Sequence, residues 1–266
     1  MIEKLKIIPT ANIISFESPA KERADKLAHE IHREGKLRNP LLVWPLDEKY
    51  LLLDDVTILS ALTHLQVSHV PVQLADSRDI SVHAWQRLIK EYSAEDILAF
   101  CKLFPRQLRA ISSATGILGN HQAEIRFRNG NRVRISVSSR SPLVRADICG
   151  KFYATLTRSH KTFRAKIDYH DPDPLGGYAD ASAVLFPPVF TLEELAEVAS
   201  RGVLLPQGFT RIDQPGRVLG IDYALSILHE NVAIDEKQSF LYELLWMRMS
   251  SDRIAYYNGA VIMFNS

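Results

Sequence analysis

The spacing of apolar and polar residues changes repeatedly along residues 1–92. Short apolar runs bounded by proline or polar residues predict strands, at 5–9, 41–46, 50–54 and 70–74. Apolar positions three and four apart predict helices at 20–34, which ends at Gly35, and at 55–65. This alternation of strands and helices is typical of a small α/β unit.

The pattern differs beyond residue 92. Helical spacing predicts a helix from Ser93, its N-cap, to Phe104, and the capping box of Thr191 and Glu194 opens a second one that ends at Gly202. Further elements are predicted over the rest of this part, in chain order a hairpin at 123–137, a loop at 170–177, a helix at 235–249 and a hairpin at 253–264 with Asn258-Gly259 at its tip. Between 142 and 188 the signals are weak. We therefore expect an α+β protein with two lobes, residues 1–92 and 93–266, joined by a seam within 90–120.

The hairpin at 123–137 carries an unusual number of arginines. With a three-residue loop, Arg128 faces Arg132 and Arg126 faces Arg134, while the alternate apolar residues share the opposite side. One side of the hairpin is then wholly cationic. Such a side is either a solvated face above a small core or a surface that binds an anion or an acidic partner.

Composition is that of an ordinary soluble globular protein. The 266 residues are 46% hydrophobic and 24% charged, with a formal net charge of +1. No global field therefore attracts nucleic acid or a membrane surface, and no apolar run is long enough for a membrane span or a secretion signal. We expect a cytoplasmic protein, in which Cys101 and Cys149 are reduced structural thiols.

Several common site motifs are absent. The segment HEIH at 29–32 lacks the spacing of a zinc-binding HExxH helix, and there is no Walker A, GxGxxG or GxSxG sequence. His170, Asp171 and Asp173 could hold a hard cation, although acids in a proline-rich loop more often belong to a solvated turn.

The segment YLLLDDVTILSAL at 50–62 raises a sharper question. A predicted strand runs directly into a predicted helix, and a helix N-terminus at such a place commonly binds phosphate. Here the junction is occupied by two acids, Asp54 and Asp55. The acids either cap the helix, or hold a metal ion, or mark an altered phosphate site.

The order of several segments resembles one known family. The segments are LKIIPTANIISFES, RNPLLVW, YLLLDDVTILSAL, VPVQLAD, VHAW and TLEELAEVASRGVLLPQGFTRI. Their order and spacing are similar to those of the free serine kinases built on the ParB/sulfiredoxin fold, and most similar to the branch found in the staphyloferrin B siderophore cluster. The resemblance implies a ParB/sulfiredoxin-like nucleotide-binding lobe at 1–92, with a second α+β lobe at 93–266 that completes the substrate cleft.

The resemblance also implies an activity and a catalytic base. Members of the family phosphorylate the hydroxyl of free L-serine with ATP or ADP and Mg²⁺, and in siderophore synthesis O-phosphoserine supplies 2,3-diaminopropionate. Their catalytic glutamate follows a histidine; this chain has Phe16-Glu17 there, so the carboxylate is kept and its neighbour is not. Arg23 matches an arginine of the siderophore branch. Without the resemblance, Glu17 and Arg23 would be interpreted as surface residues.

The phosphate motif of the family, Asp-Gly-x-His-Arg, falls on residues 54–58. Only Asp54 is kept, as a candidate for holding metal or phosphate, while Asp55, Thr57 and Ile58 replace the glycine, the histidine and the arginine. Glycine permits a close approach of phosphate to the backbone, and the two basic residues donate charge-assisted hydrogen bonds. Asp55 and Thr57 therefore stand at positions where the family contacts its nucleotide.

Three further residues, two of them in the second lobe, match positions that the family uses near its ligands. Thr210 and Arg211, in GFTRI, align with a Thr-Arg pair, and an arginine fork suits a carboxylate or phosphate. Trp85, in VHAW, matches a tryptophan of the family and is either a pocket wall or a core residue.

Two functions follow from these residues. The first is a serine kinase that binds L-serine or a similar small molecule together with a nucleotide. The second is a pseudokinase that senses a ligand after losing the phosphate contacts. ParB-type DNA binding is disfavoured, because no helix-turn-helix pattern follows the first lobe.

Overall fold

The computed structural model describes residues 2–112, 118–119, 121–229, 231–251, 254–257 and 261–264. The chain forms two compact units, one made of residues 1–81 and 212–266 and the other of residues 82–211. The expected division into 1–92 and 93–266 differs from this one chiefly because the C-terminal segment joins the first unit. A single cut along the sequence cannot describe a unit built from both ends of the chain.

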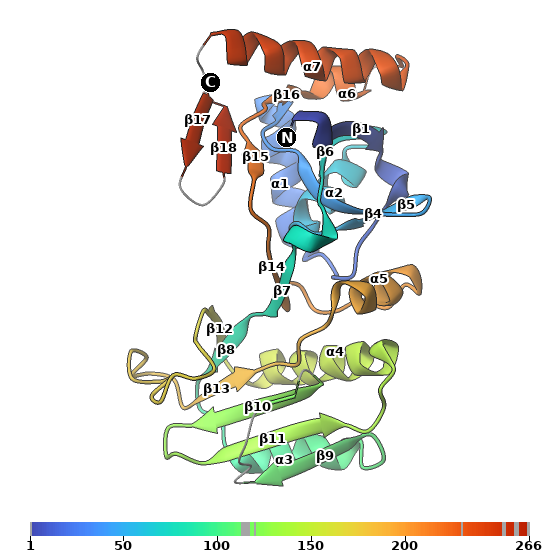
Figure 1. Ribbon diagram of the computed structural model, residues 1–266. Helices are drawn as coiled ribbons and strands as arrows, with labels where there is room; N and C mark the ends of the chain where they lie inside the picture. The colour runs from blue at the N-terminus through green and yellow to red at the C-terminus, as the bar shows by residue number, and fades with distance from the viewer. Residues whose placement is uncertain are drawn as a thin grey trace. The chain divides into compact units, whose positions relative to one another are not determined.

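The first unit contains a five-stranded mixed sheet (Figure 1). Its strands, in spatial order, are β1 (Leu5–Pro9), β6 (His69–Leu74), β4 (Leu41–Leu46), β5 (Lys49–Leu52) and β2 (Ile13–Ile14). Its two long N-terminal helices are α1 (Lys21–Glu34) and α2 (Val56–His64). The strands and helices predicted in residues 1–92 up to Leu74 are thereby confirmed, and Gly35 ends α1 in the left-handed conformation with φ of 66°.

The remaining elements of the first unit come mostly from the C-terminal segment. The strands are β3 (Lys36–Leu37), which pairs with β16 (Tyr223–Ala224), and the group β15 (Arg217–Leu219), β18 (Val261–Phe264) and β17 (Ile254–Tyr257). The helices are α6 (Leu225–His229), α7 (Ile234–Ser250) and the short 3-10 helices Ile2–Lys4, Thr10–Asn12 and Ser77–Asp79. The predicted helix at 235–249 and terminal strand pair are confirmed; the predicted tip, Asn258-Gly259, lies outside the described residues.

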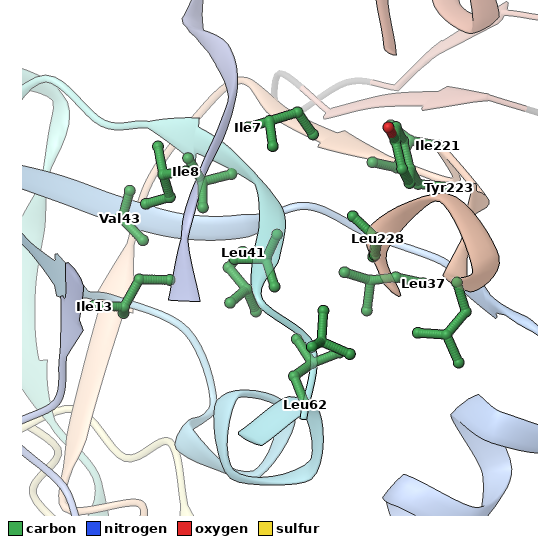
Figure 2. Close-up of a cluster of buried hydrophobic side chains, with 14 of the residues drawn as sticks. Ile7, Ile8, Ile13, Leu37, Leu41, Val43, Leu62, Ile221, Tyr223 and Leu228 are labelled. Carbon is green, nitrogen blue, oxygen red and sulfur yellow. The ribbon is translucent and has the colours of Figure 1, made fainter. Parts of the chain in front are cut away.

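Apolar side chains from both ends of the chain form the core of the first unit (Figure 2). Ile7 comes from the edge strand β1, Val43 from the central strand β4 and Leu62 from α2. They share one cluster with Ile221 and Tyr223 of the C-terminal segment. Tyr223 is fully buried, and its hydroxyl donates a hydrogen bond of 2.9 Å to the carbonyl of Lys237. The C-terminal segment is therefore an integral part of this unit.

The second unit is built on a six-stranded sheet. Its strands, in spatial order, are β12 (Thr162–Ala165), β8 (Gln86–Ile89), β13 (Ala183–Phe186), β10 (Gln122–Phe127), β11 (Arg132–Val137) and β9 (Leu108–Ser112). Its helices are α3 (Ala94–Leu103), α4 (Pro142–Ser159) and α5 (Leu192–Ser200), and α4 runs beside the sheet and packs against α5 (Figure 1). The chain passes between the units within β7 (Ser81–Ala84) and β14 (Thr210–Asp213).

The predicted N-cap at Ser93 and the predicted capping box of Thr191 with Glu194 are confirmed, and Ser93 also forms a capping box with Asp96. Helix α4 was not predicted, although the sequence contains two signals for it. Proline stands at its start, and apolar residues recur at helical spacing along one buried side. The buried stripe also contains Arg145, which is 0% exposed, and this charge interrupts the apolar pattern.

The hairpin of β10 and β11 has a different register from the expected one. Arg126 faces Arg132, and Glu124 faces Arg134. The Phe127 N–H donates to the Asn131 carbonyl at 2.9 Å, so the three-residue turn is 128–130, one residue earlier than expected, with Gly130 left-handed at φ of 84°. A shift of two residues leaves each side chain on the predicted face, but the prediction of a wholly cationic side is wrong, because Glu124 lies within it.

Other expectations concern the cysteines and the membrane. Cys101 and Cys149 are free and buried, as predicted, and burial raises the pKa of the Cys149 thiol to about 12. None of the helices in the described part of the chain has the length and apolar character needed to cross a membrane.

Candidate functional site

The N-terminus of α2 is capped by Asp55. Its carboxylate accepts a hydrogen bond of 2.8 Å from the Thr57 N–H and a second one from the Thr57 hydroxyl. Thr57 is only 4% exposed. The capping interpretation of this acid is therefore confirmed, and the carboxylate engages an N–H of the first turn, one of the groups by which a helix end binds an anion.

Asp54 makes contacts that the sequence did not indicate. Its Oδ2 accepts hydrogen bonds from the Leu42 N–H at 2.6 Å and from Arg217 Nη2 at 2.9 Å. Both side chains of the ion pair are mostly buried, at 24% exposed for Asp54 and 17% for Arg217. Arg217 is 163 positions away, so local patterns could not identify it. Both contacts use Oδ2, and no residue of the described part donates to Oδ1 in the hydrogen bonds that we find.

Strand pairing brings Glu17 and Asp54 to the same edge of the first sheet. β2 and β5 are parallel, with Ile14 opposite Leu51. Glu17 stands three residues beyond Ile14, and Asp54 stands three residues beyond Leu51. Because parallel strands end at a common edge, the two carboxyl-bearing residues leave the sheet on the same side, where α2 begins.

Glu17 and Arg23 each have one local contact that limits their position, a backbone turn for Glu17 and an ion pair for Arg23. The Ser15 hydroxyl accepts a hydrogen bond of 3.1 Å from the Glu17 N–H and donates one of 3.0 Å to the Glu17 carbonyl, which holds the backbone in a turn. Phe16, where the family has histidine, is a buried core residue at 4% exposure. Arg23 Nη2 lies 3.9 Å from Asp55 Oδ2, and both side chains are about half exposed, so this ion pair contributes little stability.

Three of the predicted residues, Trp85, Thr210 and Arg211, belong to the second unit. The Trp85 N–H donates to the Phe209 carbonyl at 3.0 Å, which ties Trp85 to the residue before Thr210. The guanidinium carbon of Arg211 lies 5.7 Å from the centroid of a Trp85 ring, and that of Arg164 lies 5.8 Å from it. The half-buried tryptophan thus fixes the position of two cations by cation–π contact.

A pocket of about 750 Å³ lies against Arg211 within the second unit. Its wall carries Lys166, the histidines His83 and His170, and one acid, Asp168. This volume is within the roughly 300–1,000 Å³ typical of small-molecule sites. The excess of basic side chains suits a ligand with a carboxylate or phosphate group.

A buried charge cluster in the second unit was not anticipated. Glu124, fully buried, accepts from Arg126 Nε at 2.8 Å, from Arg134 Nη2 at 2.9 Å and from the Tyr169 hydroxyl at 3.1 Å. The guanidinium carbon of Arg126 also lies 4.3 Å from the centroid of the Tyr169 ring and 4.7 Å from that of the Phe186 ring. Burial alone would raise the pKa of Glu124, but these hydrogen bonds and the charge of Arg126 hold it below its usual value.

Metal coordination by the protein alone is limited. Within the described ranges, no three His, Cys, Asp or Glu side chains cluster closely enough to hold an ion. The loop at 170–173 is a turn in which the Asp173 N–H donates to Asp171 Oδ1 at 2.9 Å. A single carboxylate that shares Mg²⁺ with ligand phosphates and water is nevertheless a common arrangement, and Asp54 Oδ1 fits that role.

The comparisons with known proteins identify the fold. No family model and no curated protein matches the chain. Among solved structures, SbnI from Staphylococcus aureus with a C-terminal truncation is similar over 93% of this chain and 98% of its own, with a TM-score of 0.76 and 17% identity. A free serine kinase in complex with AMP is similar over 85% of this chain and 93% of its own, with a TM-score of 0.67 and 17% identity.

A mutant of free serine kinase in complex with ADP also matches, with a TM-score of 0.64 and 15% identity over 85% of this chain and 94% of that one. The chain therefore has the α+β fold of the free serine kinases, as the sequence resemblance implied. At 15–17% identity, these likenesses establish the fold and leave the activity to be argued from the residues.

Proposed function

We propose that this protein is a nucleotide-dependent phosphotransferase that phosphorylates the hydroxyl of free L-serine or a similar small molecule. The observation that carries the proposal is the parallel pairing of β2 with β5. Because of this pairing, Glu17 and Asp54 both follow the same end of the sheet, where α2 begins. Support for a nucleotide comes from the shared fold of proteins solved with AMP and ADP.

In this proposal Glu17 is the general base. Its carboxylate accepts the proton of the serine hydroxyl while the oxygen bonds to the terminal phosphorus of ATP or ADP, and the phosphorus–oxygen bond to the leaving nucleotide breaks. Mg²⁺, when bound, would neutralise the phosphate oxygens. Asp54 would hold that ion through Oδ1, while Arg217 and the Leu42 N–H keep Oδ2 in place.

The remaining predicted residues would bind and orient ligands. Arg23, on α1, and Thr57, in the first turn of α2, both contact Asp55 and would contact the nucleotide. Arg211, whose guanidinium lies near the ring of Trp85, would bind an anionic ligand group, with Thr210 beside it in the chain. A cation held against an aromatic ring loses little side-chain freedom on binding, which favours its use as a fixed anion contact.

The cap at Asp55 favours a second candidate, a pseudokinase that binds a ligand without turnover. The carboxylate engages a first-turn N–H and repels phosphate, and Thr57 and Ile58 supply no charge. Each lost charged hydrogen bond costs roughly 1.5–3 kcal/mol. Two such losses weaken transition-state binding roughly a hundred- to ten-thousandfold. A slow kinase and a ligand sensor therefore both agree with this local structure.

The deciding experiment measures O-phosphoserine formed from L-serine and Mg²⁺ with either ATP or ADP. The kinase should give product above a Glu17→Gln variant, while a matched Glu22→Gln variant, with an exposed glutamate on α1, should keep full activity. Product no higher than in Glu17→Gln would overturn the kinase proposal. Nucleotide binding measured by thermal shift then identifies a pseudokinase, because a bound nucleotide raises Tm without turnover.

A further inference from the structure

A second pocket of the second unit lies beside the β10–β11 hairpin, and none of its lining residues is among those assigned to phosphotransfer. Its volume is about 340 Å³, and it lies between the hairpin and the loop at 172–175. Three arginines line it, Arg126, Arg128 and Arg132, against one acid, Asp173. Its wall therefore carries an excess of positive charge, although the chain as a whole has a net charge of only +1.

Arg128 is held in place by the protein backbone. Its Nε donates to the Ala181 carbonyl at 2.9 Å, and its Nη2 donates to the carbonyls of Leu175 and Tyr178 at 3.3 and 2.5 Å. These acceptors are neutral, so they orient the guanidinium without cancelling its charge. No hydrogen bond from its Nη1 is found within the described part of the chain, which leaves donors for a ligand.

Arg126 and Arg132 are direct cross-strand partners. Like charges in that position repel each other. Glu124 does not compensate both of them, because its two oxygens accept from Arg126 and from Arg134 on the far side of the cluster. Arg132 is exposed and has no ion pair within the described ranges. A dianion beside Arg126, Arg128 and Arg132 would remove this repulsion.

We propose that this pocket, lined by Arg126, Arg128 and Arg132, is an anion site for the phosphate group of a small molecule, separate from the phosphotransfer residues. Three planar guanidinium groups, of which one is fixed by carbonyls and one by a buried carboxylate, suit the several acceptor oxygens of a phosphate. The pocket volume is within the range of small-molecule sites. The ligand is either free phosphate or a phosphate ester.

The test titrates the full chain with inorganic phosphate and, separately, with O-phosphoserine, by calorimetry at low ionic strength. Arg132→Gln should weaken binding about tenfold, the effect of one charge-assisted hydrogen bond. Arg132 has no protein partner in the described ranges, so this variant should fold normally. The matched control is Arg109→Gln, with an exposed arginine on β9 of the same sheet that lies outside the pocket.

Two results would overturn the proposal. One is the absence of binding of both probes by the unmodified protein, and the other is an equal loss of binding in Arg132→Gln and Arg109→Gln. Binding of both probes identifies a general phosphate site, and binding of O-phosphoserine alone identifies an ester site. Activity with L-serine is measured on the same variants. Arg132 is not one of the phosphotransfer residues. Failure of this site is therefore seen in the binding titrations, and failure of the kinase proposal is seen in the activity with L-serine.

Discussion

The start of α2 and the β10–β11 hairpin both gather charges within a few residues, and they differ in how those charges are partnered. At α2, the Asp55 carboxylate accepts from Thr57 in the first turn of the helix, and the Asp54 carboxylate accepts from a backbone N–H and from Arg217. At the hairpin, Glu124 is buried between two arginines, while further arginines line an open pocket. The first region has partners for its acids, whereas the second has more cations than acids.

This contrast separates structural charge from charge available for binding. A local cap fixes a helix start and lowers the attraction of that helix end for phosphate. Cations that exceed their partners do the reverse, since they favour binding of an anion. The start of α2, which the sequence resemblance aligns with a phosphate motif, is thus the less cationic of the two regions.

The largest expected effect is at Glu124. Glu124→Gln leaves two buried arginines without their carboxylate, so the free energy of unfolding should fall by about 3–5 kcal/mol. Urea unfolding measures this as a lower midpoint at unchanged m value. The triple change Glu124→Leu, Arg126→Met and Arg134→Leu removes every charge of the cluster and should cost much less. A loss below about 1 kcal/mol for the single change would show that the cluster is not a buried ion network.

Acid should weaken the same cluster. The pKa of Glu124 in the folded protein lies below its ordinary value of 4.5. A group with a lowered folded pKa contributes stability that is fully present above the unfolded pKa and is lost as the pH falls through the folded pKa. The difference in unfolding free energy between the unmodified protein and Glu124→Gln should therefore shrink below about pH 4.5. A difference that stays constant between pH 7 and pH 3 would contradict this assignment.

Asp54→Asn tests the ion pair between Asp54 and Arg217. The variant removes the charge that pairs with Arg217 and weakens the acceptor for the Leu42 N–H. We expect a loss of about 1–2 kcal/mol, reduced from the value for a fully buried pair because both side chains are partly exposed. Arg217→Gln should cost a similar amount, and the double variant should cost less than the sum. Additive losses would mean that the two side chains do not interact.

The two regions also differ in what the sequence could predict. Caps at Asp55, Ser93 and Thr191 depend on neighbours within three residues, so their patterns sufficed. The strands and helices of the first unit up to Leu74 were predicted for the same reason, because their apolar spacing is regular. Local spacing likewise placed the hairpin and the face that each of its side chains occupies.

Long-range partners could not be predicted in this way. Arg217 reaches Asp54 across 163 positions, and the C-terminal segment joins the first unit across the whole second unit. The hairpin register depended on which three residues form the turn, and a turn at 128–130 placed Glu124 rather than Arg126 opposite Arg134. The pocket at the arginines requires a loop from 172–175, a region where the sequence indicated only a turn.

Variants at Asp55 distinguish the effect of the helix cap on stability from its effect on nucleotide binding. Asp55→Ala should lower the free energy of unfolding by about 1 kcal/mol, whereas Asp55→Gly should cost only a few tenths, because glycine is tolerated at the N-cap. Asp55→Gly also uncovers the Thr57 N–H and removes the negative charge. Nucleotide affinity, measured by thermal shift, should then rise relative to the unmodified protein. Unchanged affinity in Asp55→Gly would mean that this helix end does not limit nucleotide binding.

Arg132 should show the smallest change in stability. Arg132→Gln removes an exposed cation that faces Arg126 across the strands, so the free energy of unfolding should rise slightly, by no more than about 0.5 kcal/mol. Arg126→Gln, on the other strand of the same pair, should instead destabilise the protein, because Arg126 is buried with Glu124. High salt screens exposed charges and should remove the gain in Arg132→Gln. A clear loss of stability in Arg132→Gln would mean that this arginine already has a partner within the protein, and the hairpin would then resemble the start of α2.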